Sequence, residues 1–297
     1  MSNKKSKHRW SLWLIALLFF IGVASILYPV VSNLLNVMTA NTVTAGYDNE
    51  VQNMSDNELD ELLKQAQHYN AELYKGTADS EDAKCLNRTD GIMCYLDVPS
   101  INVYLPVYYG TSEDVLQKGC GYLENTSLPV GGENTHSVIS GHTGLPSAKM
   151  LTDLDQVEVG DMFYIHVLGE VLAYKIDDIH AVTPDSTDSL RIVPGEDYVT
   201  LLTCTPYGIN DKRLLVRGVR VPYDPDAVAD TEEKITDPPT TQDGLDWAVM
   251  EQIINISLIV LVALIVFVIA ILIVRHNTKK LRRDNAEKHN DDEKQEE

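Results

Sequence analysis

The sequence predicts an all-β domain of about eight short strands, a closed barrel or a sandwich, flanked by an N-terminal and a C-terminal transmembrane helix. Two observations support this expectation. Two long apolar segments without a charged residue lie near the two ends of the chain. Between them, short runs rich in β-branched and aromatic residues alternate between apolar and polar positions, and few stretches have apolar residues at helical spacing.

The apolar segments cover residues 10–31 and 253–274. Each is long enough to cross the hydrocarbon core, which takes about 20 helical residues. A buried core helix is the alternative for either segment, and a cleaved signal peptide is a further one for the first. The second segment is apolar on every face, and the apolar part of the first is longer than in a usual signal peptide. We therefore expect two uncleaved spans.

Lysine and arginine are frequent in residues 1–9 and at the start of the charged tail 275–297. Because basic flanks stay in the cytoplasm, we expect both termini inside the cell and the residues between the spans outside. The outside part divides into a helical N-terminal region with a short loop (32–90), the β domain (91–222) and a linker rich in proline and acidic residues (223–252).

The net charge of −20 argues against nucleic-acid binding, which needs a basic surface. Cys85, Cys94, Cys120 and Cys204 are too few for a disulfide scaffold. A bridge between two of the first three is possible outside the cell. A buried thiol is the alternative for Cys94 and Cys120. A reversible bond between Cys85 and Cys204 is a further hypothesis.

A helix is expected over residues 52–75, where Ser55 and Glu58 have the spacing of a capping box. Residues 76–90 are expected to form a polar loop. Short helices are expected near Thr111 and over residues 146–157, where proline occupies the first turn. The expected strands are residues 92–98, 101–109, 136–140, a hairpin over 162–176, 198–204 and 213–221.

Cys204 ends the run YVTLLTC (198–204), at the rim of the sheet, and a short polar loop then reverses the chain. Arg213 opens the returning strand and is expected to lie beside Cys204 across the hairpin. A cation there favours the thiolate and can bind an oxyanion. A buried structural cysteine is the alternative, but it would need no such arrangement.

A cysteine nucleophile also needs a proton carrier. Of the histidines between the spans, only His142 combines a strand end with a flexible, glycine-flanked loop, in SGHTG (140–144), where catalytic groups tend to lie. A structural or solvated role is expected for the others, which are His68, His136, His166 and His180.

These residues resemble the signature of the sortases. TLLTC matches their TLxTC motif, SGHTGLP matches the segment around their histidine, and an arginine nine residues after the cysteine has the family's spacing. The resemblance covers roughly residues 91–222. TCTPYGIN followed by RLLVRG, together with the C-terminal span, resembles the class C, pilus-assembling sortases of Gram-positive cell surfaces.

The resemblance implies a closed sortase-type β-barrel and a cysteine transpeptidase of the thiol-peptidase class, without metal or cofactor. Cys204 is then the nucleophile that cleaves an LPxTG-like sorting signal between Thr and Gly. His142 is the general acid and base, and Arg213 stabilises substrate and oxyanion. The thioacyl enzyme is resolved by an amine, a pilin lysine in class C or a cell-wall peptide amine in other classes.

Three alternatives stay open at this point: a sortase that anchors surface proteins to the cell wall, a catalytically inactive module that binds sorting signals, and a cysteine hydrolase. The chain also departs from the class C pattern. The lid-position loop 76–90 lacks an Asp-Pro-aromatic motif, although Asp79 or Asp82 could reach Arg213. Asp211 and Lys212 stand where Thr-His is common.

Overall fold

The computed structural model describes residues 3–88, 91–145 and 147–225, and in the C-terminal part residues 257–263, 265–267 and 283. It divides the chain into two compact units, residues 1–31 with 245–297 and residues 32–244. The expected linker, second span and charged tail lie largely outside the described residues. The two units are therefore described separately.

Helix α1 runs over Asn3–Gln52. Among the described residues it is the one helix that is long and apolar enough to cross a membrane. Several large apolar side chains of residues 16–31 are exposed, among them Leu17, Phe20 and Ile26. Within the same unit, the ring of Phe19 stacks on that of Phe267, with the centroids 5.0 Å apart. Such a helix is suited to anchor the chain in a membrane.

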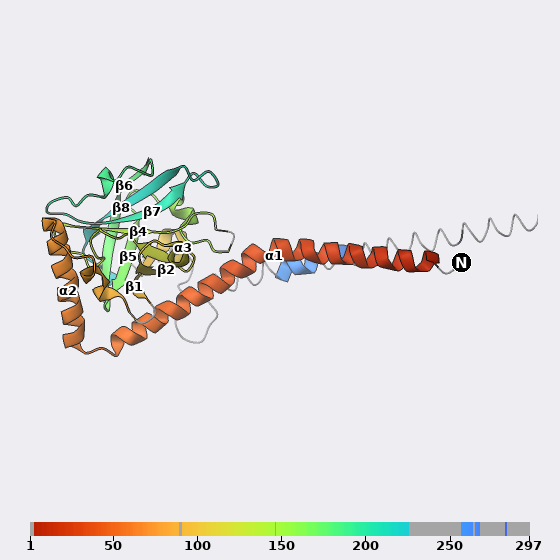
Figure 1. The fold of residues 1–297 in the computed structure, drawn as a ribbon, viewed down its shortest axis with the longest axis horizontal. Helices are drawn as coiled ribbons and strands as arrows, with labels where there is room; N and C mark the ends of the chain where they lie inside the picture. The colour runs from red at the N-terminus through yellow and green to blue at the C-terminus, as the bar shows by residue number, and fades with distance from the viewer. Residues whose placement is uncertain are drawn as a thin grey trace, which may run out of the picture. The chain divides into compact units, whose positions relative to one another are not determined.

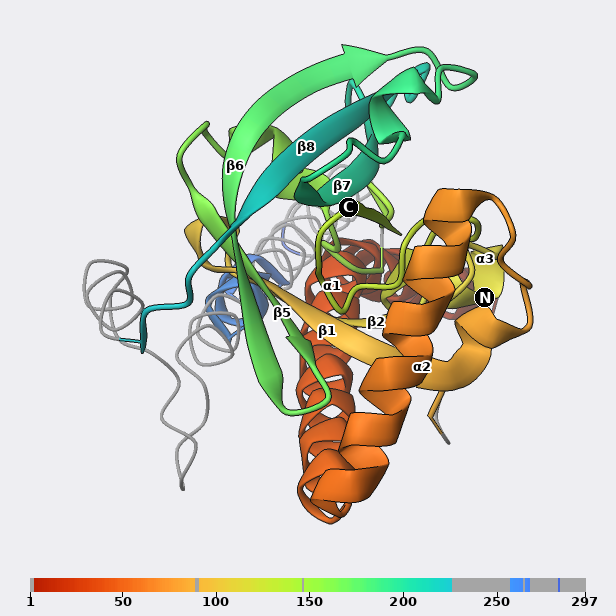
Figure 2. The same ribbon diagram turned by 90° about the vertical axis from the view of Figure 1, so that its left-hand side faces the viewer.

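The second unit is built on a closed barrel (Figures 1 and 2), which decides between the barrel and the sandwich that the strand pattern left open and confirms the barrel that the resemblance implied. The strand order is β1-β2-β3-β4-β7-β8-β6-β5, with β2–β3 and β4–β7 parallel and the other neighbours antiparallel. The strands are β1 (Ile92–Val98), β2 (Val103–Tyr109), β3 (Cys120–Tyr122), β4 (Thr135–Ser140), β5 (Met162–Val167), β6 (Glu170–Val182), β7 (Asp197–Thr205) and β8 (Lys212–Val221).

The barrel interior holds the fully buried aliphatic and aromatic side chains. Phe163 of β5 stacks on Tyr174 of β6, with the ring centroids 5.5 Å apart. Gly218 of β8 leaves room for this pair, because a Cβ there would clash with the Phe163 ring. In β7, Leu201 is fully buried, so the alternation turns Cys204 to the other face.

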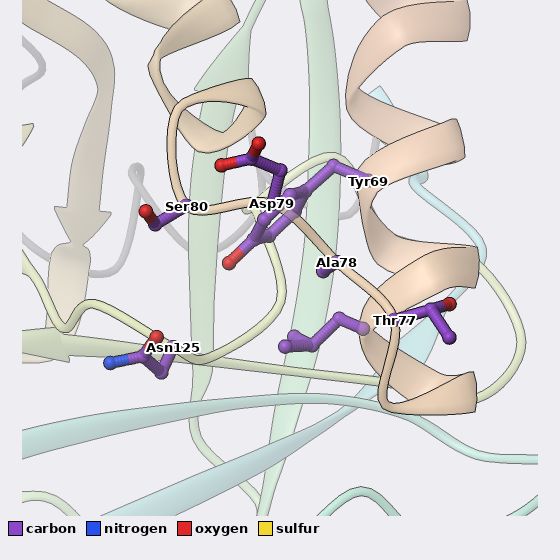
Figure 3. Close-up of a pocket in the computed structure, with 7 residues that line it drawn as sticks. Tyr69, Thr77, Ala78, Asp79, Ser80 and Asn125 are labelled. Carbon is purple, nitrogen blue, oxygen red and sulfur yellow. The ribbon is translucent and has the colours of Figure 1, made fainter.

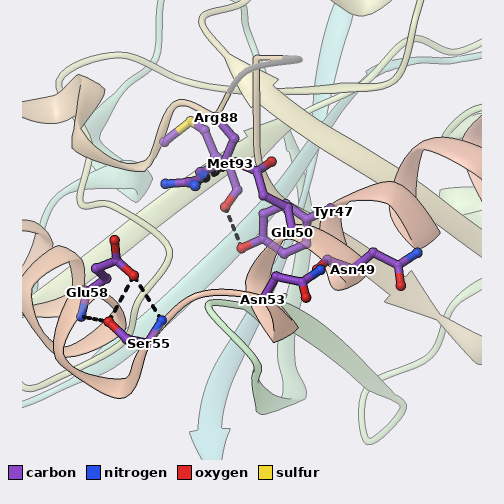
Figure 4. Close-up of polar contacts among 8 residues, drawn as sticks. All are labelled: Tyr47, Asn49, Glu50, Asn53, Ser55, Glu58, Arg88 and Met93. Atoms are coloured by element: carbon purple, nitrogen blue, oxygen red, sulfur yellow. Dashed lines mark hydrogen bonds and ion pairs between the residues drawn. The ribbon is translucent and has the colours of Figure 1, made fainter.

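Helix α2 (Asp56–Lys75) confirms the expected amphipathic helix. Ser55 and Glu58 form the capping box, visible in Figure 4, and Gly76 ends the helix in the left-handed conformation with φ 78°. Leu59, Leu62, Leu63 and Leu73 pack against the core cluster. The Asn70 amide binds both backbone groups of Leu128, which attaches α2 to the loop between β3 and β4.

Two local expectations were wrong. Residues 147–157 contain only the 3-10 turn η3 (Thr152–Gln156), because Met150 has a φ of 45° and Leu151 and Leu154 turn into the core. The loop 76–88 is not wholly polar, since the 3-10 turn η1 (Asp82–Leu86) buries Ala83 and Leu86. The remaining short helices are η2 (Pro99–Ile101), α3 (Glu113–Leu116), near the expected position, and η4 (Asp188–Leu190).

The last part of α1 packs on the barrel through a few residues of mixed size and polarity. Ala40, Thr44, Tyr47 and Val51 are buried along one side of the helix. The Tyr47 hydroxyl donates to the carbonyl of Met93 in β1 (Figure 4) and accepts from the amide of Leu168 in the β5–β6 turn. Burial accordingly raises the pKa of Tyr47. A Glu50–Arg88 ion pair closes the end of this contact.

Candidate active site

Cys204 lies near the end of β7, next to the loop that leads to β8. The register of this hairpin places Arg213 directly opposite Cys204, as the sequence predicts, and the neighbouring strand β6 places Val182 on the other side of Arg213. Cys204 is partly exposed and its thiol is free. The hairpin loop begins with a cis peptide bond between Thr205 and Pro206.

The loop that carries His142 follows β4, the parallel neighbour of β7. The amide of Gly141 donates to the carbonyl of Leu202 (3.0 Å), which continues the β4–β7 ladder by one residue. The hydroxyl of Thr203 donates to the carbonyl of Gly141 (2.8 Å). Because this uses its only proton, Thr143 must donate in its 2.6 Å contact with Thr203. The residues on both sides of His142 are thus bound to the residue before Cys204.

The same loop closes on itself and on the hairpin loop. The amide of Leu151 donates to the carbonyl of His142 (3.1 Å). Gly144, with φ 77°, lies against the ring of Tyr207, so that a Cβ at Gly144 would meet this ring at 3.0 Å. The structure therefore brings the histidine loop and the Cys204 hairpin to one end of the barrel. This arrangement is needed if Cys204 and His142 belong to one site.

The Nε2 atom of His142 lies 3.3 Å from a carboxylate oxygen of Glu113, the first residue of α3. The two groups are within ion-pair distance but are not aligned as a hydrogen bond, and this nitrogen has no other partner within the described residues. In this conformation Nε2 is buried, and the Glu113 carboxylate is its one ion-pair partner among the described residues. Glu113 was missed by sequence reasoning, since a carboxylate in a first helical turn is an ordinary capping signal.

The Arg213 guanidinium donates to the carbonyls of Asn210 (3.3 Å) and Lys212 (3.1 Å). Within the described residues it forms no ion pair with Asp79 or Asp82 of the lid-position loop. The carboxylate of Asp79 instead accepts from the amide of Glu81. The charge of Arg213 is therefore available to a bound anion at the mouth of the hairpin.

The lid-position loop lines a separate cavity of about 450 Å³ (Figure 3). Its lining residues come from α2, from this loop and from the β3–β4 loop, and none of Cys204, His142 and Arg213 belongs to them. In the described part of the chain the loop thus packs toward α2. Among the described residues of the whole chain, no group of three His, Cys, Asp or Glu side chains is placed to hold a metal ion.

Two of the other histidines hold the loop between β6 and β7. His136 is buried in β4 and donates from Nδ1 to the carbonyl of Arg191 (2.9 Å), so its Nε2 accepts from the hydroxyl of Thr200 (2.7 Å). Burial lowers the pKa of His136, which favours this neutral form. His180 of β6 contacts Asp178 in the same strand (2.8 Å) and Ser189 in this loop (3.0 Å). Both threonines of TLLTC therefore bind elements that carry a histidine: Thr200 contacts His136 in β4, and Thr203 binds Gly141 in the His142 loop.

The remaining histidines and cysteines lie in the core or away from the site. His166 stacks on Tyr95, with ring centroids 4.4 Å apart, and His68 lies on α2. Cys94 and Cys120 are fully buried on either side of Val107, two strands apart. Two strand spacings are about 10 Å, beyond the reach of a disulfide, so the bridge considered from the sequence does not form between these two.

The chain matches the sortase domain family over residues 96–221. Among curated proteins it is 25% identical to sortase A of Streptococcus agalactiae over 216 residues, which is 69% of this chain and 84% of the relative.

Among solved structures, it is similar to Clostridium perfringens sortase C with the C-terminal cell wall sorting motif (51% identity, TM-score 0.59, 62% of this chain and 100% of the other). It is also similar to sortase C of Streptococcus pneumoniae (49% identity, TM-score 0.58, 61% and 97%).

Proposed function

This chain belongs to the sortase family, with class C sortases as its structural neighbours, and we propose that it is a membrane-anchored cysteine transpeptidase that polymerises pilins. The observation that carries the proposal is the Cys204–Arg213 pair across the β7–β8 hairpin, next to a histidine loop that is bound to Thr203.

The first half-reaction transfers an acyl group to the enzyme. The Cys204 thiolate attacks the carbonyl carbon of the threonine in an LPxTG-like sorting signal, and the carbonyl electrons move to oxygen. Arg213 neutralises the resulting oxyanion. When the intermediate collapses, the Thr–Gly C–N bond breaks, protonated His142 gives its proton to the leaving amine, and a thioester to Cys204 remains.

The second half-reaction releases the acyl group to an amine. A pilin lysine attacks the thioester, neutral His142 takes its proton, and the C–S bond breaks to give an isopeptide and free Cys204. The two substrates of the proposed enzyme are then a pilin with a sorting signal and a second pilin that supplies the lysine. The solved Clostridium perfringens relative, which is described with a cell wall sorting motif, supports this substrate class.

The proposed topology places this chemistry outside the cell. Residues 10–31 and 253–274 span the membrane, residues 1–9 and 275–297 stay in the cytoplasm, and the catalytic domain 91–222 faces outward between the N-terminal region 32–90 and the linker 223–252. The basic flanks support this orientation, and the apolar first part of α1 supports the first span.

The full chain in detergent micelles, incubated with an LPxTG-type peptide and a pilin that carries a reactive lysine, tests the proposal by mass spectrometry. We expect a thioacyl adduct on Cys204 and a pilin–peptide isopeptide, both absent in Cys204→Ala. Free acid as the only product at abundant amine would show a hydrolase. Transfer to a cell-wall peptide amine but not to pilin would show an anchoring sortase.

A further inference from the structure

The helix that contains the membrane segment also contacts the histidine loop. Asn33 and Asn36 follow the expected span 10–31 within the next two turns of α1 and belong to the same compact unit as the barrel. The amide of Lys149 donates to Oδ1 of Asn33 (2.8 Å), and Nδ2 of Asn36 donates to the carbonyl of Ser147 (2.7 Å). These bonds connect residues more than 100 positions apart.

The orientation of the Asn36 amide is determined by its partners. Its Nδ2 group also donates to the carbonyl of Ser32 (3.2 Å), so both protons point at carbonyl oxygens. An amide turned the other way would place oxygen against oxygen. Asn36 therefore acts only as a donor to the loop, while Asn33 acts only as an acceptor from it.

The segment held by the two asparagines has little regular structure of its own. Among its described residues, one bridge joins Leu145 to Ala148, and Met150 has a φ of 45°. The segment nevertheless ends at Leu151, whose amide binds the carbonyl of His142. The described residues of this segment are thus bound to His142 through Leu151, to Thr203 through Thr143, and to α1 through Ser147 and Lys149.

The opposite end of this part of α1 is firmly attached. Tyr47 binds β1 and the β5–β6 turn, and Val51 packs against Gly169 in that turn. A helix held at one end by buried contacts gives the asparagines a fixed position relative to the barrel. Hydrogen bonds from a fixed element restrict a loop more than bonds within the loop do.

We infer that Asn33 and Asn36 are positioning residues, through which the anchor helix α1 holds the His142 loop in its reactive geometry. The inference rests on the proposed function, because His142 needs this geometry only if it moves protons at Cys204. It identifies residues beside the membrane segment as part of the support of the active site. A catalytic domain cut from its anchor before residue 37 would lack this support.

One substitution type at two positions tests the inference in the full chain. Asn33→Asp keeps an acceptor for the Lys149 amide, whereas Asn36→Asp replaces the donor with an oxygen that repels the Ser147 carbonyl. Asn33→Ala removes the acceptor for the Lys149 amide and is compared with Asn33→Asp, which keeps it. The readouts are the rate of thioacyl formation in a single turnover, hydrogen exchange of residues 143–151, and the melting temperature.

We expect Asn36→Asp and Asn33→Ala to form the thioacyl enzyme roughly tenfold more slowly, because small displacements of a catalytic group have large effects on rate. Exchange of the Lys149 amide should quicken about 2- to 12-fold in Asn33→Ala, the effect of one lost hydrogen bond. Asn33→Asp should resemble the wild type in both measurements, and all variants should melt within a few degrees of it.

Equal rates in all variants would overturn the inference, as would equal losses in Asn33→Asp and Asn33→Ala. If the wild type itself forms no thioacyl enzyme, the proposed function fails instead. The exchange measurement still decides whether α1 holds the loop, because it does not depend on activity.

Discussion

Thr203, the residue before the proposed nucleophile, provides a direct test of how the histidine loop is held. Its hydroxyl donates to the buried carbonyl of Gly141 and accepts from Thr143. Thr203→Val keeps the shape of this buried side chain and removes both bonds. Thr203→Ser is the matched control, because it keeps the hydroxyl and removes only a methyl group.

The structure sets the magnitude of each change. In Thr203→Val the Gly141 carbonyl loses this donor, and an unsatisfied buried acceptor costs about 1–3 kcal/mol. The lost bond to Thr143 adds little to this free-energy cost, because Thr143 is partly exposed and its hydroxyl can turn to the carbonyl of Leu151, 3.4 Å away. In a unit of this size each kcal/mol lowers the melting temperature by about 2–4 °C, so the fall should be about 2–12 °C. Thr203→Ser loses about 0.8 kcal/mol for one buried methyl group, or roughly 2–3 °C.

The assay is single-turnover thioacyl formation on the full chain, at a temperature well below both melting transitions. The valine variant should react roughly tenfold more slowly than the serine variant, because Gly141 adjoins His142 and loses its tether to β7. The serine variant should react nearly as fast as the wild type. A valine variant that reacts as fast as the serine variant would refute the reasoning, whatever its stability.

Three further predictions concern the site and the core. Arg213→Lys keeps the charge but loses the planar, forked guanidinium group. The kcat/KM for transpeptidation should therefore fall about 100-fold, with little change in melting temperature. An unchanged kcat/KM would remove Arg213 from the mechanism. Burial lowers the pKa of His166 to about 4, so the unfolded state binds more protons and the wild type should lose stability as pH falls from 6.5 toward 4. Thermal melts of His166→Phe should show a smaller loss over this pH range, and the part that remains includes the contribution of His136, whose pKa burial also lowers. In peptide mapping after native alkylation, Cys204 should be labelled and Cys94 and Cys120 should not, because burial raises the pKa of both core thiols.

The sequence predicted the barrel well because alternation is a local signal. Strands β5 and β6, their turn at Gly169, and the pairing of Cys204 with Arg213 all follow from residues close in the sequence. The capping box of α2 was predicted for the same reason. Residues 147–157 were predicted wrongly because Leu151 and Leu154 satisfy a helical spacing while serving the core from a 3-10 turn.

The packing of residues 32–52 on the barrel could not be predicted in detail. The buried positions of this part of α1 are Ala40, Thr44, Tyr47 and Val51, of which only two are large. Their spacing is helical, but small and polar residues give a weak apolar pattern. Tertiary contacts, including the Glu50–Arg88 ion pair, therefore determine a structure that intrinsic propensity only permits.

The same reasoning explains why the candidate residues of the site are easier to select from the sequence than the residues that support them. A nucleophile, a proton carrier and a cation belong to motifs whose spacing is fixed by strands and turns, so Cys204, His142 and Arg213 can be recognised from short stretches. The groups that orient them act through single hydrogen bonds between distant segments, such as Asn36 with Ser147 or Thr203 with Gly141. Such bonds impose no period on the sequence, and only the folded chain reveals that α1 and β7 bind the same loop.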